Sequence, residues 1–157
     1  MTAMLILTIG VFSNIAYSSY GKISQEASVF NDAAYALKLM QSKIRSSTSM
    51  SVKTNPPNPP WKSSEILFKY SHIVGGVETF LEGAFGLYQT SGSSTIDLVY
   101  VPDTTQTKKE VLLSVKAGQA LNFTLSNITA QSLTVQLSGT KNGIPFNVNN
   151  VVFRRTL

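Results

Sequence analysis

The side chains that could catalyse a reaction are few in this sequence. The chain contains no Cys and a single His, His72, which excludes disulfides, thiolate zinc sites and cysteine nucleophiles. As a catalytic base His72 would need a nucleophile and an acid such as Asp97, but the G-x-S-x-G pattern of a hydrolase nucleophile does not occur. Gly75-Gly76 lacks nucleotide-loop spacing and indicates a strand bend or bulge. We therefore expect no enzymatic activity and no cofactor.

The remaining polar motifs are weak. Neither Asp97 nor Asp103 belongs to a D-x-D motif, the spacing typical of calcium-binding loops, so we expect no metal site. The tripeptides Asn122-Phe-Thr124 and Asn127-Ile-Thr129 match the N-glycosylation pattern, which is a short motif in a chain rich in Thr. The net charge is +5, but the 13 Lys and Arg residues are scattered, without the dense basic stripe of nucleic-acid binders. Direct contact with nucleic acid is not expected.

The elements that organise the chain begin with an uncharged segment, residues 1–17, which reads MTAMLILTIGVFSNIAY. Its 17 residues would span ~26 Å as a helix, close to the hydrocarbon thickness of a bilayer. No Lys or Arg precedes Lys22, which argues against a cleaved secretory signal, and a buried soluble helix would need a large partner domain. A membrane helix fits best. Its membrane and assembly residues are expected to be Leu5, Ile6, Leu7, Ile9, Gly10, Val11, Phe12 and Asn14.

Helical periodicity continues to about residue 47, because no Pro occurs before Pro56 and apolar residues recur at steps of three and four. Ala33, Ala36 and Met40 widen the apolar stripe. A helix of this length would reach ~70 Å, so its first half must project from any small domain. The residues expected to pack this helix against a sheet are Ile23, Ala27, Phe30, Ala34, Leu37 and Ile44.

Four of the six prolines fall within residues 55–60, NPPNPP, which predicts an extended linker that ends the helical region. After Trp61, expected to pack between linker and sheet, short alternating runs separated by turn residues predict strands. These runs are 65–70, 73–78, 85–89, 95–101, 110–115, 120–125, 132–137 and 147–154. Alternation favours an antiparallel sheet with one polar face. We thus expect an α+β chain: an N-terminal helix region (1–52), a Pro-rich linker (53–60) and an antiparallel β-sheet domain (61–157), with the helix packed on the sheet.

A long N-terminal helix that is apolar and then amphipathic, followed by a linker and an antiparallel sheet, resembles the type IV pilin superfamily. This superfamily includes minor pilins and the pseudopilins of type II secretion. The likeness lies in residues 1–17, in residues 30–45 (FNDAAYALKLMQSKIR), and in SLTVQL, KNGIPF and VVFRR within residues 132–155. It implies a pilin-like fold and a structural subunit, a minor pilin or pseudopilin, of a type IV pilus or type II secretion filament.

The resemblance also implies location and partners. The chain would be a single-pass protein of the bacterial inner membrane, with its C-terminal domain in the periplasm or outside the cell. It would join a filament used for secretion, adhesion, motility or DNA uptake, and polymerise through its helix. Its partners would be other pilin or pseudopilin subunits, the inner-membrane assembly platform and the lipid bilayer. The family would also place local unwinding near Gly10 and residues 18–21.

The sequence departs from the family at its start. Family members begin with a basic leader that ends in Gly and carry a Glu shortly after the cleavage point. Here Met1 is followed by TAMLILTIG, without these features. We expect them to be encoded upstream of Met1; if they are not, leader cleavage and the pairing of that Glu with a neighbouring N-terminus are both in doubt.

Alternatives remain at the C-terminus and for the whole chain. Arg154 and Arg155 are either a solvated strand edge that discourages sheet pairing or an inter-subunit contact with an acidic face. The chain could also be a membrane-tethered adhesin or ligand-binding domain that does not polymerise. A third function, an anchored hydrolase, would have His72 as its only candidate His base.

Overall fold

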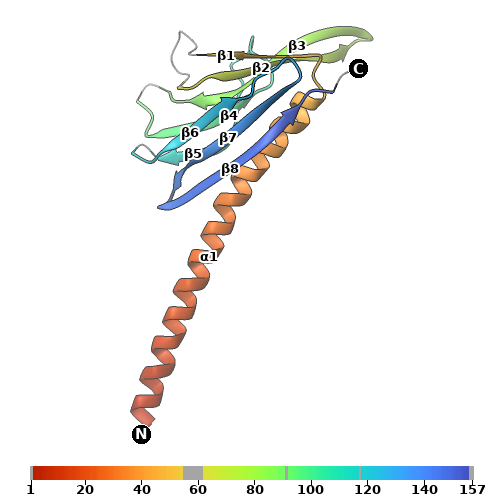
Figure 1. Cartoon of the computed structure of the whole chain (residues 1–157). Helices are drawn as coiled ribbons and strands as arrows, with labels where there is room; N and C mark the ends of the chain where they lie inside the picture. The colour runs from red at the N-terminus through yellow and green to blue at the C-terminus, as the bar shows by residue number, and fades with distance from the viewer. Residues whose placement is uncertain (1, 55–61, 91, 117, 156–157) are drawn as a thin grey trace.

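The computed structural model describes residues 2–54, 62–90, 92–116 and 118–155, and side chains from Ile15 onward. Over these ranges the chain is α+β, with one long N-terminal helix packed on antiparallel β-structure (Figure 1). This confirms the predicted fold class at that level. The elements are α1 (Thr2–Arg45), β1 (Ser49–Lys53), β2 (Glu65–Val74), β3 (Val77–Tyr88), β4 (Thr95–Val101), β5 (Glu110–Lys116), β6 (Leu121–Ser126), β7 (Ser132–Lys141) and β8 (Ile144–Phe153).

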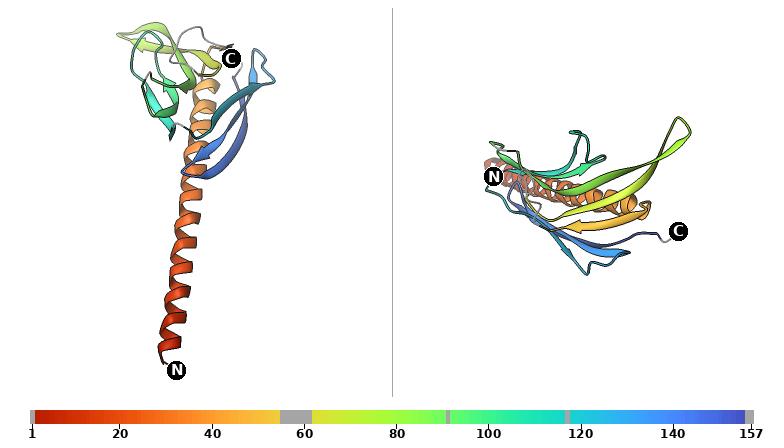
Figure 2. Two further views of the ribbon diagram at one scale, coloured as in Figure 1. Left: turned by 90° about the vertical axis from the view of Figure 1, so that its left-hand side faces the viewer. Right: turned by 90° about the horizontal axis from the view of Figure 1, so that it is seen from above.

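The strands form two sheets where a single sheet was expected. Sheet A has the order β1-β2-β3-β4-β5 and sheet B the order β6-β7-β8, with every pair antiparallel. In the left view of Figure 2 the two sheets lie on opposite sides of the C-terminal half of α1. The helix packs against β5 of sheet A and against β7 and β8 of sheet B. One helix with a wide apolar face is therefore covered by two sheets.

Two strand assignments from the sequence were wrong for local reasons. Residues 73–78, expected as one strand, contain a hairpin turn, because Gly75 and Gly76 have φ values of 58° and 82°. Two successive residues of positive φ are typical of the tight turns that join antiparallel strands. The short strand expected at 85–89 is the end of the 12-residue β3. The edge strand β1, a polar SMSVK segment, was not expected.

The core forms where α1 meets both sheets. Fully buried side chains include Phe68 and Phe85 from sheet A and Leu133 and Leu137 from sheet B. Phe68 and Phe85 stack with ring centroids 5.3 Å apart, and Phe85 stacks on Tyr100 at 4.9 Å. Aromatic pairs of this kind add about 0.5–1.5 kcal/mol each beyond the area they bury. The stack fixes β2, β3 and β4 relative to one another beneath the helix.

The face of α1 that packs on the sheets agrees only in part with the predicted face. Leu37 and Ile44 lie in the core as expected, as do Ala33, Ala36 and Met40, which widen the predicted stripe. Ile23, Ala27, Phe30 and Ala34 are exposed. The helix crosses the sheets with its neighbouring face, and its residues before Val29 extend past both sheets. The helix residues buried in the core are Val29, Ala33, Ala36, Leu37, Met40 and Ile44.

Candidate assembly surface

The first half of α1 projects from the domain, and none of the described strands covers it (Figure 1). From Ile15 to Ser28 every residue is exposed, and Val29 is the first buried residue among those with described side chains. Tyr17, Tyr20 and Ile23 are 80%, 76% and 64% exposed. These three residues follow one another at steps of three, so their side chains adjoin along the helix surface. Exposed apolar side chains that adjoin in this way indicate a site of protein or membrane contact. The projecting half of α1 is therefore the candidate assembly surface.

The helix residues expected to enter the membrane lie further toward the N-terminus. Their backbone belongs to α1, but their side chains lie outside the described residues: Leu5, Ile6, Leu7, Ile9, Gly10, Val11, Phe12 and Asn14. Among the residues whose side chains are described, no helical stretch has both the length and the hydropathy required to cross a bilayer. The linker at 55–60 and Trp61 also fall outside the described residues.

Serine side chains end the helix at the opposite end. The Ser46 hydroxyl donates to the carbonyl oxygens of Ser42 and Lys43 at 3.2 and 3.0 Å. The Ser47 hydroxyl donates to Ile44 O at 2.7 Å, and its N–H donates to the same oxygen at 3.0 Å. These bonds satisfy carbonyl groups that a helix end leaves without intrahelical partners. Ser46 and Ser47, the first residues of the Ser/Thr run at 46–49, thus cap the C-terminal end of α1.

Polar contacts at three positions along α1 join the helix to β8 and to the residues that flank this strand. The Asp32 carboxylate accepts from Nζ of Lys141, the last residue of β7, at 2.8 Å. Further along, Asn150 donates to Gln41 Oε1 at 3.3 Å. At the top, the Arg155 N–H donates to Arg45 O at 3.3 Å.

The predicted inter-subunit pair of arginines has different roles within the chain. The Arg154 guanidinium donates from Nη1 to the carbonyl of Thr48, just beyond the helix. The Arg155 side chain is exposed and lines a pocket at the helix end. The internal contact of Arg154 could not be anticipated from sequence, because the two residues that it joins are more than one hundred positions apart. Contact of either arginine with another subunit stays a prediction.

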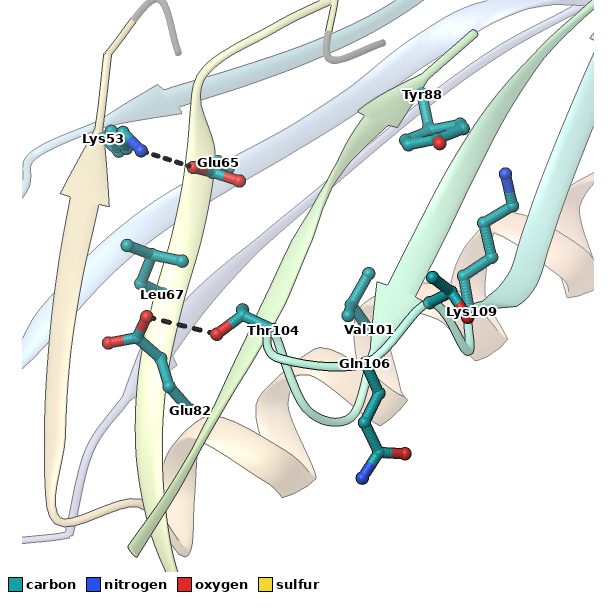
Figure 3. A pocket seen from close by; sticks show the side chains of 10 residues that line it. Lys53, Glu65, Leu67, Glu82, Tyr88, Val101, Thr104, Gln106 and Lys109 are labelled. Atoms are coloured by element: carbon teal, nitrogen blue, oxygen red, sulfur yellow. Dashed lines mark hydrogen bonds and ion pairs between the residues drawn. The ribbon is translucent and has the colours of Figure 1, made fainter. Parts of the chain in front are cut away.

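A polar groove opens on the face of sheet A that is turned away from the helix. It encloses about 520 Å³, and Leu67 and Val101 contribute apolar side chains to it. In Figure 3, Lys53 approaches Glu65 at 3.7 Å, and Thr104 donates to Glu82 at 3.4 Å. The other lining residues are Tyr88, Gln106, Thr107 and Lys109.

The groove contains side chains of both charges. Burial raises the pKa of Glu65 above its ordinary value of 4.5, while the Lys53 ammonium opposes the rise and Glu82 adds to it. Lys109 Nζ lies 3.6 Å from the centre of the Tyr88 ring, a cation–π contact. The lining residues offer hydrogen bonds and both charges to a small polar ligand, and those that the structure describes include no His or Cys.

The other residues considered for chemistry lie apart from one another. His72 is exposed in the β2–β3 hairpin, where its backbone oxygen accepts from the Thr79 hydroxyl at 2.9 Å. Asp97 accepts from Ser114 at 2.6 Å. Asp103 accepts from Thr105 and Gln106, and the Thr105 bonds hold its pKa below the ordinary value. Within the described ranges no three His, Cys, Asp or Glu side chains are grouped to hold a metal.

Comparison of this chain with protein-family models, curated proteins and solved structures finds no match. The functional argument consequently depends on the residues and on the geometry described above.

Proposed function

We propose that this chain is a structural subunit of a type IV pilus or type II secretion filament, a minor pilin or pseudopilin with a pilin-like fold. It is anchored in the bacterial inner membrane through its N-terminal helix, with the β-domain in the periplasm or outside the cell. It polymerises through that helix with other pilin or pseudopilin subunits at an inner-membrane assembly platform. Its role in this proposal is mechanical and does not involve catalysis.

One observation carries the proposal: α1 divides into a half that the domain covers and a half that it leaves exposed. The covered half begins at Val29, and the exposed half presents Tyr17, Tyr20 and Ile23 to solvent. Burying apolar surface is worth about 25 cal/mol per Å², so three such side chains favour association with lipid or with other helices. A helix fixed at one end to a domain and uncovered at the other supports bundling with copies of itself.

The same surface suits reversible transfer between the membrane and a filament. Lipid tails and packed apolar side chains provide similarly apolar surroundings, so exchange between them has little hydrophobic driving force. Packing and hydrogen bonds between helices then decide the direction. Ser18, Ser19 and Gly21 are small residues on the exposed stretch that allow close approach of neighbouring helices.

The proposal is tested by placing a charge on the exposed half of α1. Ile23→Asp in the full chain should abolish filaments and cross-linked oligomers in cells, because an aspartate cannot be buried among apolar helices without a partner. Ile128→Asp is the matched control, since Ile128 is also exposed but lies in the loop between β6 and β7. The control should assemble like the wild type. Normal assembly of Ile23→Asp, at a normal amount of folded protein, would contradict the proposal.

The groove on sheet A favours a second candidate function, a membrane-tethered adhesin or ligand-binding domain that does not polymerise. The groove combines apolar side chains with polar groups of both signs, an arrangement common to small-ligand sites. In that case Ile23→Asp would leave the cellular function intact, whereas Lys109→Glu in the groove would remove it. The opposite pattern supports the filament subunit.

A further inference from the structure

The β2–β3 hairpin extends beyond both of its neighbouring strands. Pairing of β1 with β2 stops at Ser49–Lys69, and pairing of β3 with β4 stops at Ala84–Val101. From Tyr70–Leu81 to Val74–Val77 the two strands pair only with each other. An isolated two-stranded hairpin is at best marginally stable in water. This overhang, residues 70–81, lies at the end of the domain away from the projecting helix (Figures 1 and 2).

The overhang is apolar on both faces and carries one exposed acidic side chain. Ile73 and Phe80, on one face, are 70% and 59% exposed. Val74 and Val77, which pair with each other at the turn, are also exposed on the other face. Glu78 is opposite Ile73, where the Ser71 hydroxyl donates to its carboxylate at 2.6 Å. A partner for this surface must accept apolar side chains together with a fixed negative charge.

A surface with the complementary charge lies at the C-terminal end of α1. A pocket of about 520 Å³ there is lined by three cationic side chains, Lys38, Arg45 and Arg155. The remaining lining residues described for it, Gln41, Ser42, Ser46 and Ser47, are uncharged. Beside it on the helix, Tyr35 is exposed one turn before Lys38.

Among the described residues, no ion pair accounts for the three cations. The ion pairs in the described ranges are Lys53–Glu65 and Lys141–Asp32, and neither includes a cation of this pocket. The last helix carbonyls already accept from Ser46, Ser47 and the backbone of Arg155. Like charges gathered around one hollow repel each other unless an anion is placed among them. The hollow therefore suits an acidic group from outside the chain.

We propose that the β2–β3 overhang of one copy binds the Lys38–Arg45–Arg155 pocket of a second copy, with Glu78 facing the cations and the apolar tip against Tyr35. Hairpin and pocket are different surfaces of the same chain, so each copy can use both at once. When a copy uses its hairpin and its pocket with two different neighbours, the contact is heterologous and extends into an open helical array unless it closes into a ring, whereas a reciprocal contact with a single neighbour would close a two-fold dimer. The inference rests on the proposed function, because it specifies how polymerising copies meet outside the helix bundle.

Disulfide cross-linking tests the contact directly, because the chain has no natural Cys. Two full-length variants, Val74→Cys and Ser42→Cys, are co-expressed with different tags and oxidised in cells. A disulfide between the two tags can form only between copies and is the expected product. Each variant expressed alone should give little dimer. Dimers of Val74→Cys alone would indicate a symmetric hairpin contact and overturn the proposal.

Charge reversal provides the second test. Glu78→Lys and Arg45→Glu should each lower the yield of the disulfide between the two introduced cysteines by about tenfold or more, and the double variant should restore it. Lys38→Glu is a second cation reversal, for the case in which Arg45→Glu affects the helix end. Glu110→Lys is the matched control, because Glu110 is an exposed acid at the start of β5, and it should change nothing.

The outcomes separate this inference from the function on which it rests. If Ile23→Asp abolishes assembly while the charge reversals and the cysteine pair behave like unmodified controls, the hairpin contact is wrong and the filament subunit stands. If the wild-type chain forms no oligomers under any of these conditions, both proposals fail. Loss on each single reversal and recovery in the double variant supports both.

Discussion

At the scale of single residues, Glu65 is a nearly buried carboxyl group with an incomplete partner. It is 5% exposed, and its ion pair with Lys53 spans 3.7 Å, longer than a direct hydrogen bond. Burial raises its pKa because the charged form loses hydration that the distant ammonium does not replace. The folded state therefore holds a proton on Glu65 more tightly than the unfolded state does.

This carboxyl group makes stability depend on pH in a predictable direction. A group with a raised folded pKa stabilises the protein below its unfolded pKa and loses that contribution as the pH rises through the folded value. Relative to Glu65→Gln, the wild type should thus gain stability as the pH falls from 7 toward 4.5, and the difference should then level off. Urea unfolding of both proteins across this range measures it. A constant difference would contradict the assignment, and Glu110→Gln is the exposed control.

Gly139 is a second residue whose identity the structure explains. It lies in β7 opposite Leu121, and a Cβ at this position would overlap the backbone carbonyl of Ala120. The same carbonyl accepts from the Thr140 N–H at 2.8 Å, so the neighbouring backbone is not free to move away. Only a residue without a side chain allows this approach.

Gly139→Ala should therefore destabilise the domain by about 3 kcal/mol, in the range of overpacked sites where backbone must shift. Ser138→Ala, at the preceding and partly exposed position, should stay within about 0.5 kcal/mol of the wild type. The free energy of unfolding in urea compares the two. A Gly139→Ala protein as stable as Ser138→Ala would show that β6 and β7 separate easily at this point.

At the scale of elements, the helix was the easiest part to predict and its buried face the hardest. Its end near residue 47 follows from local signals, the Ser/Thr run and the prolines after it. The buried face does not, because Ala27 and Ala34 continue one apolar row while Ala33 and Ala36 belong to its neighbour. Both rows satisfy helical periodicity. The choice depends on where β8 docks, and that contact is long-range.

The buried face of α1 is tested by a pair of alanine substitutions. Met40 is fully buried, whereas Phe30 is 42% exposed although it belongs to the predicted row. Met40→Ala should cost about 2–5 kcal/mol by leaving a cavity, and Phe30→Ala should cost less than about 1 kcal/mol. Thermal or urea unfolding of the full chain in detergent gives both values. A larger loss of stability for Phe30→Ala than for Met40→Ala would contradict this burial.

Strand prediction failed where pairing partners, and not local composition, decide the structure. Alternating apolar residues located β7 well, because it has one buried face. They also located β4, although Val99 and Val101 are buried on its second face. The turn of the β2–β3 hairpin could not be recognised from the sequence, because its two glycines lie within an apolar run that contains Ile73, Val74 and Val77. Strand β1 is polar and short, so only its register with β2 reveals it.

At the scale of the whole molecule, the candidate surfaces differ in how far sequence could predict them. The exposed half of α1 follows from the excess length of one helix over a small domain. The cationic pocket could not be predicted, because it joins Lys38 to Arg155 across the length of the chain. The groove likewise unites β1, β2, β3 and the loop after β4. Local sequence patterns predict single helices and strands. A site that is made of residues from distant elements can be recognised only in the structure.

The three polar contacts between α1 and the β8 region have a mechanical consequence. Asp32 with Lys141, Gln41 with Asn150, and Arg45 with Arg155 are distributed along the helix, and the core side chains of α1 from Ala33 to Ile44 lie between them. A tensile force on the helix along its axis loads these contacts in shear, all at the same time. Under such a force the contacts do not break one after another from one end of the helix. The junction between α1 and the β-domain is thus arranged to resist a force that pulls along the helix axis.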